Sequence, residues 1–174
     1  YVIPKNDEFF SEYSAKDRLR IISNFSGSAG FAIILKNKNL LFVDGRYTIQ
    51  AQMETGKIFK IVDLQKIINC NLFKNLTLGI DPNLFTSGQI KKFFLKNNKI
   101  KVIAENLIDK ISFGYKSASK PFYSLYNDVV GEDYKNKINK VSNILKKNKS
   151  DYIFISAPEN VAWLLNLSLI HIWR

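Results

Sequence analysis

Residues 23–52, SNFSGSAGFAIILKNKNLLFVDGRYTIQAQ, form the stretch on which the rest of the chain depends. Within it, the apolar runs 31–35 and 40–43 are separated by the polar residues 36–39. Two short apolar runs joined by four polar residues predict a β-hairpin. Because neither run alternates between apolar and polar side chains, we expect both faces of the hairpin to be covered.

The hairpin leads directly into Asp44, Gly45, Arg46 and Tyr47. The Asp44 side chain is expected to cap the following helix, because a carboxylate accepts a free backbone N–H of a first turn. Gly45 permits a tight turn, and Arg46 presents a guanidinium fork that suits a carboxylate or a carbonyl. On the residues alone, Asp44 and Arg46 are more simply explained as turn residues than as a ligand site.

A run of small residues, SGSAG at 26–30, precedes the hairpin. Its spacing matches neither the G-x-G-x-x-G nor the G-x-x-x-x-G-K-[ST] phosphate-binding pattern, which argues against a nucleotide loop. Ser28 lies outside a G-x-S-x-G context and no usable base accompanies it, so it is not a predicted nucleophile. We therefore attribute the small side chains to close packing of a strand against a helix.

Length and composition favour a folded protein. The chain has 174 residues, of which 46% are hydrophobic and 13% aromatic, enough for one domain and part of another. No apolar run approaches the roughly 20 residues that span a bilayer, and no signal peptide is visible. Cys70 is the single cysteine, so no intrachain disulfide can form, which favours a cytoplasmic location. Its apolar neighbours predict a buried, inert thiol.

The formal net charge is +11 and the isoelectric point about 9.6. A basic chain can bind polyanions, so a stand-alone basic binding module for nucleic acid is one interpretation. The lysines are scattered among asparagines, however, and no basic run interleaves with aromatic residues on one face. A solvated lysine-rich surface is the favoured explanation, and nucleic acid is not the expected partner.

Outside the hairpin, short apolar runs alternate with helical patterns. Strands are expected at 1–3, 57–62, 76–80 and 99–104, and helices at 16–23, 46–54, 64–73, 86–96 and 105–110. Strands that alternate with helices, together with an antiparallel hairpin, predict an α/β domain over residues 1–113. Its sheet should be mixed and flanked by helices.

The pattern changes after residue 113. Residues 114–128 have no period and contain turn-forming residues, which predicts a linker. A helix at 132–148, a strand at 151–156 and a helix beginning at Pro158 are expected to follow. Residues 129–174 are therefore interpreted as the start of a second, truncated α/β domain, too small to bury a core of its own.

The motifs resemble a known family. SGSAG, the hairpin, FVDGRY and a glutamine-bearing helix resemble the N-terminal domain of the Xaa-Pro aminopeptidases (aminopeptidase P), in the creatinase/prolidase superfamily. Residues 3–13, IPKNDEFFSEY, resemble the family's opening strand and its SEY segment. Residues 157–166, APENVAWLLN, resemble the start of the second domain in three-domain members. The match breaks after Asn166, where the family continues into IRG and this sequence reads LSLIHIWR.

The resemblance implies a reaction and its cofactors. These enzymes remove the N-terminal residue from peptides that have proline at position two. They use two divalent metal ions, with manganese as the expected metal, in a catalytic domain that lies C-terminal to the part resembled by this chain. No catalytic or metal-binding residue is therefore assigned to this chain, and His171 is interpreted as an ordinary tail residue. The chain alone is expected to be inactive.

The resemblance also implies partners and one site residue. This portion is expected to shape substrate access beside its own catalytic domain, with a homodimer left open and no membrane partner. In three-domain members the arginine of the DGRY motif contacts the peptide, so Arg46 is the candidate substrate-binding residue. Asp44, Gly45 and Tyr47 are expected to form its supporting turn.

Overall fold

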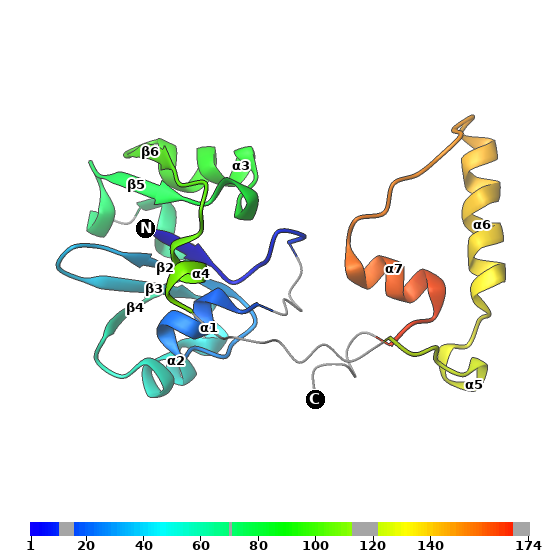
Figure 1. The fold of residues 1–174 in the computed structure, drawn as a ribbon, viewed down its shortest axis with the longest axis horizontal. Helices are drawn as coiled ribbons and strands as arrows, with labels where there is room; N and C mark the ends of the chain where they lie inside the picture. The colour runs from blue at the N-terminus through cyan, green and yellow to red at the C-terminus, as the bar shows by residue number, and fades with distance from the viewer. Residues whose placement is uncertain (11–15, 70, 113–121, 169–174) are drawn as a thin grey trace. The chain divides into compact units, whose positions relative to one another are not determined.

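The computed structural model describes residues 1–10, 16–69, 71–112 and 122–168. The chain divides into two compact units, Tyr1–Lys116 and Ser117–Arg174, and each is described by itself (Figure 1). The first unit holds two sheets and most of the helical turns, and the second is helical.

The larger sheet of the first unit has four strands in the order β1-β2-β3-β4. They are β1 (Val2–Pro4), β2 (Gly30–Ile34), β3 (Asn39–Val43) and β4 (Phe59–Asp63). Strands β1 and β3 both pair with β2 antiparallel, whereas β4 pairs with β3 in parallel. The predicted hairpin and the predicted mixed sheet are therefore confirmed.

Both faces of the β2–β3 hairpin are covered, as the continuous apolar runs predict. On one face the rings of Phe31 and Phe42 stack with centroids 4.8 Å apart, among a cluster supplied in part by the segments that follow β4. The other face packs Ala32, Leu41 and Val43 against residues of three helices. Each fully buried large side chain of this kind contributes about 1.5–3 kcal/mol relative to exposure.

Three helices cover the second of these faces. They are α1 (Arg18–Ser23), α2 (Thr48–Thr55) and α4 (Leu107–Ile111), and they contribute Leu19, Ala51 and Ile108 to the core. Helix α2 follows the 3₁₀ turn η1 (Gly45–Tyr47) and ends at Gly56, where φ is 58°, the conformation that favours glycine.

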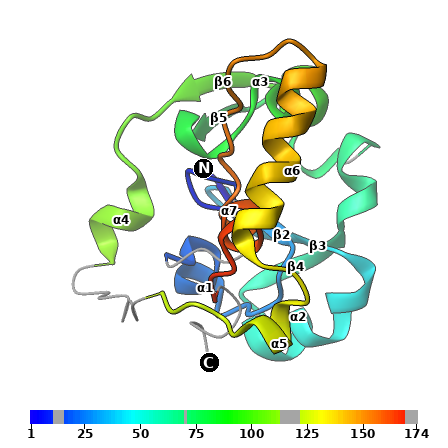
Figure 2. The same cartoon turned by 90° about the vertical axis from the view of Figure 1, so that its right-hand side faces the viewer.

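The smaller sheet contains two parallel strands, β5 (Thr77–Ile80) and β6 (Lys99–Val102). Their crossover runs through the turn η4 (Pro82–Leu84), helix α3 (Ser87–Ile90) and the π-helical turn η5 (Lys91–Leu95). Thr86 caps α3 through a reciprocal pair of hydrogen bonds with Gln89. In Figures 1 and 2, β5, β6 and α3 gather at one end of the first unit.

The helix predicted at 64–73 is wrong in type. The segment forms two 3₁₀ turns, η2 (Leu64–Asn69) and η3 (Asn71–Phe73). Ile67 and Phe73 still reach the core, but Ile68 is exposed. Adjacent β-branched residues and asparagines are poor helix formers, so tertiary packing sets the local geometry here.

Several chain segments meet at one edge of the larger sheet. The Lys5 N–H donates to the Gly30 carbonyl oxygen, Gly30 lies opposite Val43, and Val43 lies opposite Asp63. The carboxyl ends of β1, β3 and β4 therefore share this edge with the loop that enters β2. We call it the carboxyl edge. In open α/β sheets, ligands bind beyond the carboxyl ends of strands.

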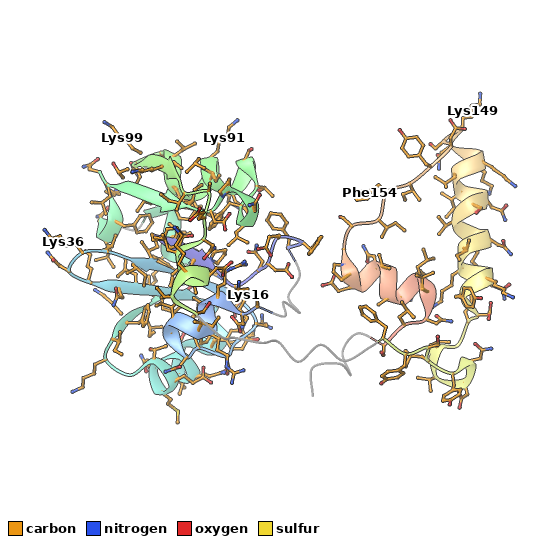
Figure 3. The ribbon with its side chains drawn as sticks, viewed as in Figure 1. Lys16, Lys36, Lys91, Lys99, Lys149 and Phe154 are labelled. Atoms are coloured by element: carbon orange, nitrogen blue, oxygen red, sulfur yellow. The ribbon has the colours of Figure 1, made fainter. Side chains whose placement is uncertain are left out.

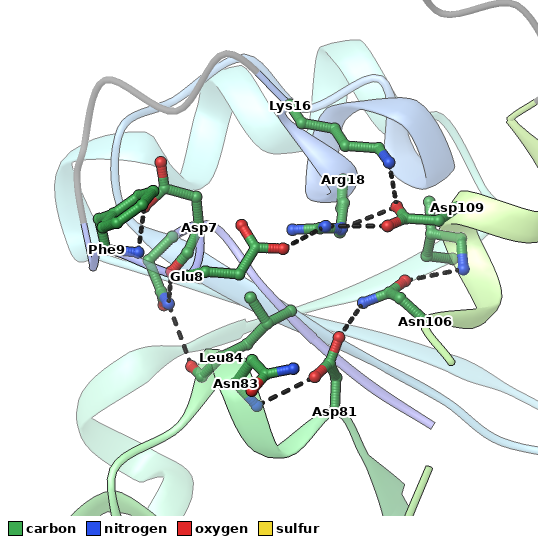
Figure 4. A network of polar contacts seen from close by, with 12 residues as sticks. Asp7, Glu8, Phe9, Lys16, Arg18, Asp81, Asn83, Leu84, Asn106 and Asp109 are labelled. Carbon is green, nitrogen blue, oxygen red and sulfur yellow. Dashed lines mark hydrogen bonds and ion pairs between the residues drawn. The ribbon is translucent and has the colours of Figure 1, made fainter. Parts of the chain in front are cut away.

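A buried arginine ties three segments together beside this edge (Figure 4). Arg18, only 4% exposed, donates from Nε to Asp109 Oδ1 at 2.8 Å and from Nη2 to Asp109 Oδ2 at 2.9 Å. Its Nη2 also donates to Glu8 Oε1 at 2.6 Å, and Lys16 pairs with Asp109 at 2.9 Å. The hydrogen bonds from Arg18 hold the pKa of Asp109 below its usual value.

The second unit is built around a buried lysine. It contains α5 (Asn127–Val130), α6 (Tyr134–Lys147) and α7 (Pro158–Leu165). Lys137 of α6 donates to the carbonyl oxygen of Trp163 at 2.9 Å and to Asn166 Oδ1 at 2.7 Å. Its Nζ also lies 4.3 Å from the centroid of a Trp163 ring. These contacts compensate the charged Lys137 ammonium group for the hydration that it loses on burial.

The strand expected at 151–156 is wrong. These residues form no strand, and none of the described segments of this unit pairs with them. Along α6, the apolar residues Tyr134 and Ile138 are exposed. Ala162 is the one buried hydrophobic residue in the described part of this unit, whereas Phe154 is 86% exposed.

Replacing Asp109 with asparagine should destabilise the first unit by about 2–3 kcal/mol at pH 7, because the buried Arg18 loses its main counter-charge. The folded-state pKa of Asp109 is lowered, so its contribution is complete above the unfolded pKa of about 4 and is lost as the pH falls through the folded pKa. Denaturant unfolding at pH 7 and at pH 3 measures both effects. Glu105→Gln, which disrupts only an exposed pair with Lys110, should leave the midpoint unchanged.

We predict that the segment 117–174 does not fold alone, since its described part exposes most of its apolar side chains. Thermal circular dichroism should give a gradual change for this segment and a cooperative transition for 1–116. In the 174-residue chain, limited proteolysis should cut first between Lys116 and Asp128. A sigmoidal melt of 117–174, or first cleavage within 1–113, would contradict the expected division.

Candidate functional site

The turn that carries the candidate residues lies between β3 and α2, at the carboxyl edge. Asp44 Oδ1 accepts the backbone N–H of Arg46 at 3.0 Å, and the Asp44 carbonyl oxygen accepts the N–H of Tyr47 at 2.8 Å. The predicted cap is therefore confirmed, with the bond closing the 3₁₀ turn that precedes α2.

The Arg46 side chain is exposed, but contacts with its neighbours fix its orientation. Its side chain is 75% exposed, and Nε donates to Asp44 Oδ1 at 2.9 Å. The guanidinium carbon also lies 5.6 Å from the centroid of the Tyr47 ring. The hydrogen bond from Arg46 lowers the pKa of Asp44, so this carboxylate stays charged and keeps the fork in place near neutral pH. An arginine needed only for the fold would be expected to lie buried, as Arg18 does.

Tyr47 connects this turn to the loop of small residues. Its hydroxyl group lies 2.9 Å from Ser28 Oγ, and its ring meets the edge of the Phe25 ring with centroids 5.9 Å apart. The ring is half-buried at the side of the core cluster that α1 and α2 complete. Tyr47 therefore fixes the position of the residue beside it, Arg46, relative to the core.

Helix α2 holds the same loop from its other side. Glu54 accepts the Ser26 N–H at 2.7 Å and the Ser26 hydroxyl at 2.6 Å, and Gln50 Nε2 donates to both Ser26 Oγ and Glu54 Oε1. Desolvation raises the pKa of Glu54, but these hydrogen bonds together bring it below its usual value. This cluster was not predicted from the sequence, although the spacing of Gln50 and Glu54 places them on one helix face.

Two glycines of the loop are required by close contacts. A Cβ on Gly27 would lie 2.3 Å from Cζ of the Phe25 ring, and one on Gly30 would lie 2.6 Å from the Phe42 carbonyl oxygen. The small residues were expected to pack a strand against a helix. The structure instead packs them against an aromatic ring and the neighbouring strand.

Gly45 differs from these two glycines. A Cβ built on it would meet nothing within 4 Å, and its backbone needs no glycine-specific conformation. Gly45 was expected to permit a tight turn, and residues 45–47 do form the 3₁₀ turn η1, although this turn does not require glycine. The absence of a side chain at Gly45 leaves the space next to its Cα open.

The four predicted residues Asp44, Gly45, Arg46 and Tyr47 thus lie on one turn. Cys70 and His171 lie outside the described residues, so the predictions about them remain predictions. Within the described ranges, no three Asp, Glu, His or Cys residues gather where they could hold a metal ion. The Asp and Glu side chains of the described residues do not fit a two-metal centre, so no metal chemistry is assigned to them.

Two further features bear on partners. Among the described residues, no helix is both long and apolar enough to cross a membrane. Figure 3 shows Lys36, Lys91 and Lys99 of the first unit extending in different directions. Nucleic-acid binding through a single basic face is not supported by this distribution.

Comparison with known proteins gives consistent matches along the chain. The family model described as "Creatinase/Prolidase N-terminal domain" matches residues 11–111, and a second model with the same description matches 115–167. "Xaa-Pro aminopeptidase 1" of Dictyostelium discoideum is 33% identical over 96% of this chain and 30% of its own length. "Probable Xaa-Pro aminopeptidase P" of Laccaria bicolor is 34% identical over 96% and 28%.

A solved structure agrees with these matches. The X-prolyl aminopeptidase of Caenorhabditis elegans, described as a cytosolic enzyme with a di-nuclear active site, superposes with a TM-score of 0.76 at 26% identity. The alignment covers 96% of this chain and 30% of the worm enzyme. The chain therefore spans about 30% of the length of the relatives it matches. Because one family model matches residues 11–111, more than half of the chain, the chain belongs to the creatinase/prolidase N-terminal domain family.

Proposed function

We propose that this chain is the non-catalytic N-terminal portion of a metal-dependent Xaa-Pro aminopeptidase. The relatives named above carry that activity in their names, and the chain matches only about 30% of their length. The proposal places the two metal ions in a catalytic part outside this chain, and the di-nuclear active site described for the C. elegans relative supports it. Manganese is the metal we expect there.

In this proposal the chain shapes access of the peptide to the catalytic centre. The observation that carries the proposal is Arg46, which is 75% exposed yet held by Asp44 at the carboxyl edge. A permanently charged, planar fork can donate two parallel hydrogen bonds to a peptide carbonyl or carboxylate. Because Asp44 and the Tyr47 ring already restrict the side chain, binding costs less conformational entropy.

The proposed substrate is a peptide with proline at position two, bound between this chain and the catalytic part. A homodimer remains compatible with the proposal. We also propose a cytosolic location, which is supported by the description of the similar worm enzyme as cytosolic.

Arg46→Ala in the complete enzyme should lower kcat/KM for Xaa-Pro peptides by about 10- to 100-fold, the effect of losing a charge-assisted hydrogen bond. The unfolding temperature should change little, because the side chain is exposed. Lys57→Ala, an exposed cation that precedes β4, is the matched control and should retain wild-type kinetics. A large loss of stability with unchanged kinetics would assign Arg46 to the fold.

The 174-residue chain alone should not hydrolyse Xaa-Pro peptides in the presence of Mn²⁺. The reason is that a two-metal centre needs a converging set of carboxylates and imidazoles. A fluorogenic Xaa-Pro peptide assay, with the complete enzyme as positive control, measures this directly. Metal-dependent turnover that copurifies with the isolated chain would refute the proposed division of labour.

A further inference from the structure

The loop that follows β1 presents two aromatic side chains to solvent. Phe9 is 67% exposed and Phe10 is 43% exposed. Large apolar side chains exposed as neighbours are candidates for a contact surface, whereas single exposed ones are ordinary. We call this pair the aromatic tip.

The backbone under the aromatic tip is strained and well bonded. Phe10 has φ of 58°, a left-handed conformation that is unfavourable for an aromatic residue. The Phe9 N–H donates to Asp7 Oδ1 at 3.0 Å, and the Phe10 N–H donates to the Asp7 carbonyl oxygen at 3.1 Å. Asn6 Nδ2 donates to the carbonyl oxygens of Asp7 and Leu84, both at 3.0 Å, which ties the loop to η4.

The buried arginine anchors the same loop from below. Glu8, which directly precedes the tip, accepts from Arg18 Nη2 at 2.6 Å, and Arg18 is in turn held by Asp109 (Figure 4). Arg18 is thus paired with carboxylates from two segments that are far apart in sequence. Side chains from α1 and from the loop itself therefore hold the strained loop in place, as expected where a strained conformation is maintained for binding.

The aromatic tip and Arg46 leave the sheet at the same edge. Lys5, Gly30 and Val43 form one row across β1, β2 and β3, and the chain continues from Lys5 to the tip and from Val43 to Arg46. Strands β1 and β3 are two strand spacings apart, about 10 Å, where they leave the sheet. The loop carrying Ser28 leaves from β2, between them.

We propose that the aromatic tip is an apolar subsite for the proline-containing peptide, at the same edge of the sheet as the polar contact made by Arg46. This inference rests on the proposed function and adds to it a specificity-determining pair, Phe9 and Phe10. Aromatic side chains are the surfaces on which proteins commonly bind proline, because the rigid ring packs flat on them and loses little entropy. The charged fork and the aromatic surface together distinguish a peptide from a purely apolar ligand.

The test uses the complete enzyme and steady-state kinetics on an Xaa-Pro peptide. Phe9→Ser should raise KM about two- to tenfold, the loss expected for one aromatic contact, with kcat nearly unchanged. Phe9→Tyr should restore the wild-type KM, and Phe9→Leu should restore only part of it. Ile58→Ser is the matched control: Ile58 is 70% exposed and precedes β4 at the opposite end of the strands, so its KM should not change.

Each alternative outcome has a distinct meaning. If Arg46→Ala alters the kinetics and Phe9→Ser does not, the subsite is refuted while the proposed function stands. If Phe9→Ser lowers the unfolding temperature of the complete enzyme without changing KM, the tip packs against the rest of the polypeptide, which also refutes the subsite. If neither variant alters the kinetics, the proposed function fails as well.

Discussion

The register between β2 and β3 determines where the candidate site lies. Gly30 pairs with Val43 and approaches the Phe42 carbonyl oxygen closely enough to exclude a Cβ. A slip of one residue would turn every side chain of the hairpin to the opposite face, and both faces are buried. The same pairing aligns the end of β3 with the start of β2, so Arg46 and Ser28 emerge from the same edge.

Two arginines of the first unit show how environment separates structure from function. Arg18 is buried, donates from two nitrogens to Asp109 and binds Glu8 as a second partner. Arg46 is exposed, bonded to its neighbour Asp44 and in contact with the Tyr47 ring. Removing Arg18 would take one partner from each of two carboxylates and one anchor from the strained loop, whereas removing Arg46 is expected to change little of the fold.

Local sequence signals predicted the hairpin and the Asp44 cap, because each depends on residues only a few positions apart. These signals failed where residues distant in sequence determine the local structure. Residues 151–156 have strand-like composition but no neighbouring strand among the described residues. The segment after β4 forms 3₁₀ turns because it packs against the core. The Ser26–Glu54 contact was missed for a similar reason, since 28 residues separate its members. The resemblance, rather than residue chemistry, singled out Arg46.

The contact between Arg18 and Asp109 closes a loop of 91 residues. Closing a loop of that length costs more chain entropy than forming the hairpin, whose strands are joined by a short turn. The Arg18–Asp109 contact is therefore expected to form more slowly than the hairpin. We therefore expect the hairpin to belong to the folding nucleus and the Arg18–Asp109 pair to form after the transition state. A contact that forms after the transition state changes mainly the unfolding rate. The Arg18–Asp109 pair therefore sets how long the folded state, including the strained loop beside Glu8, lasts before it unfolds.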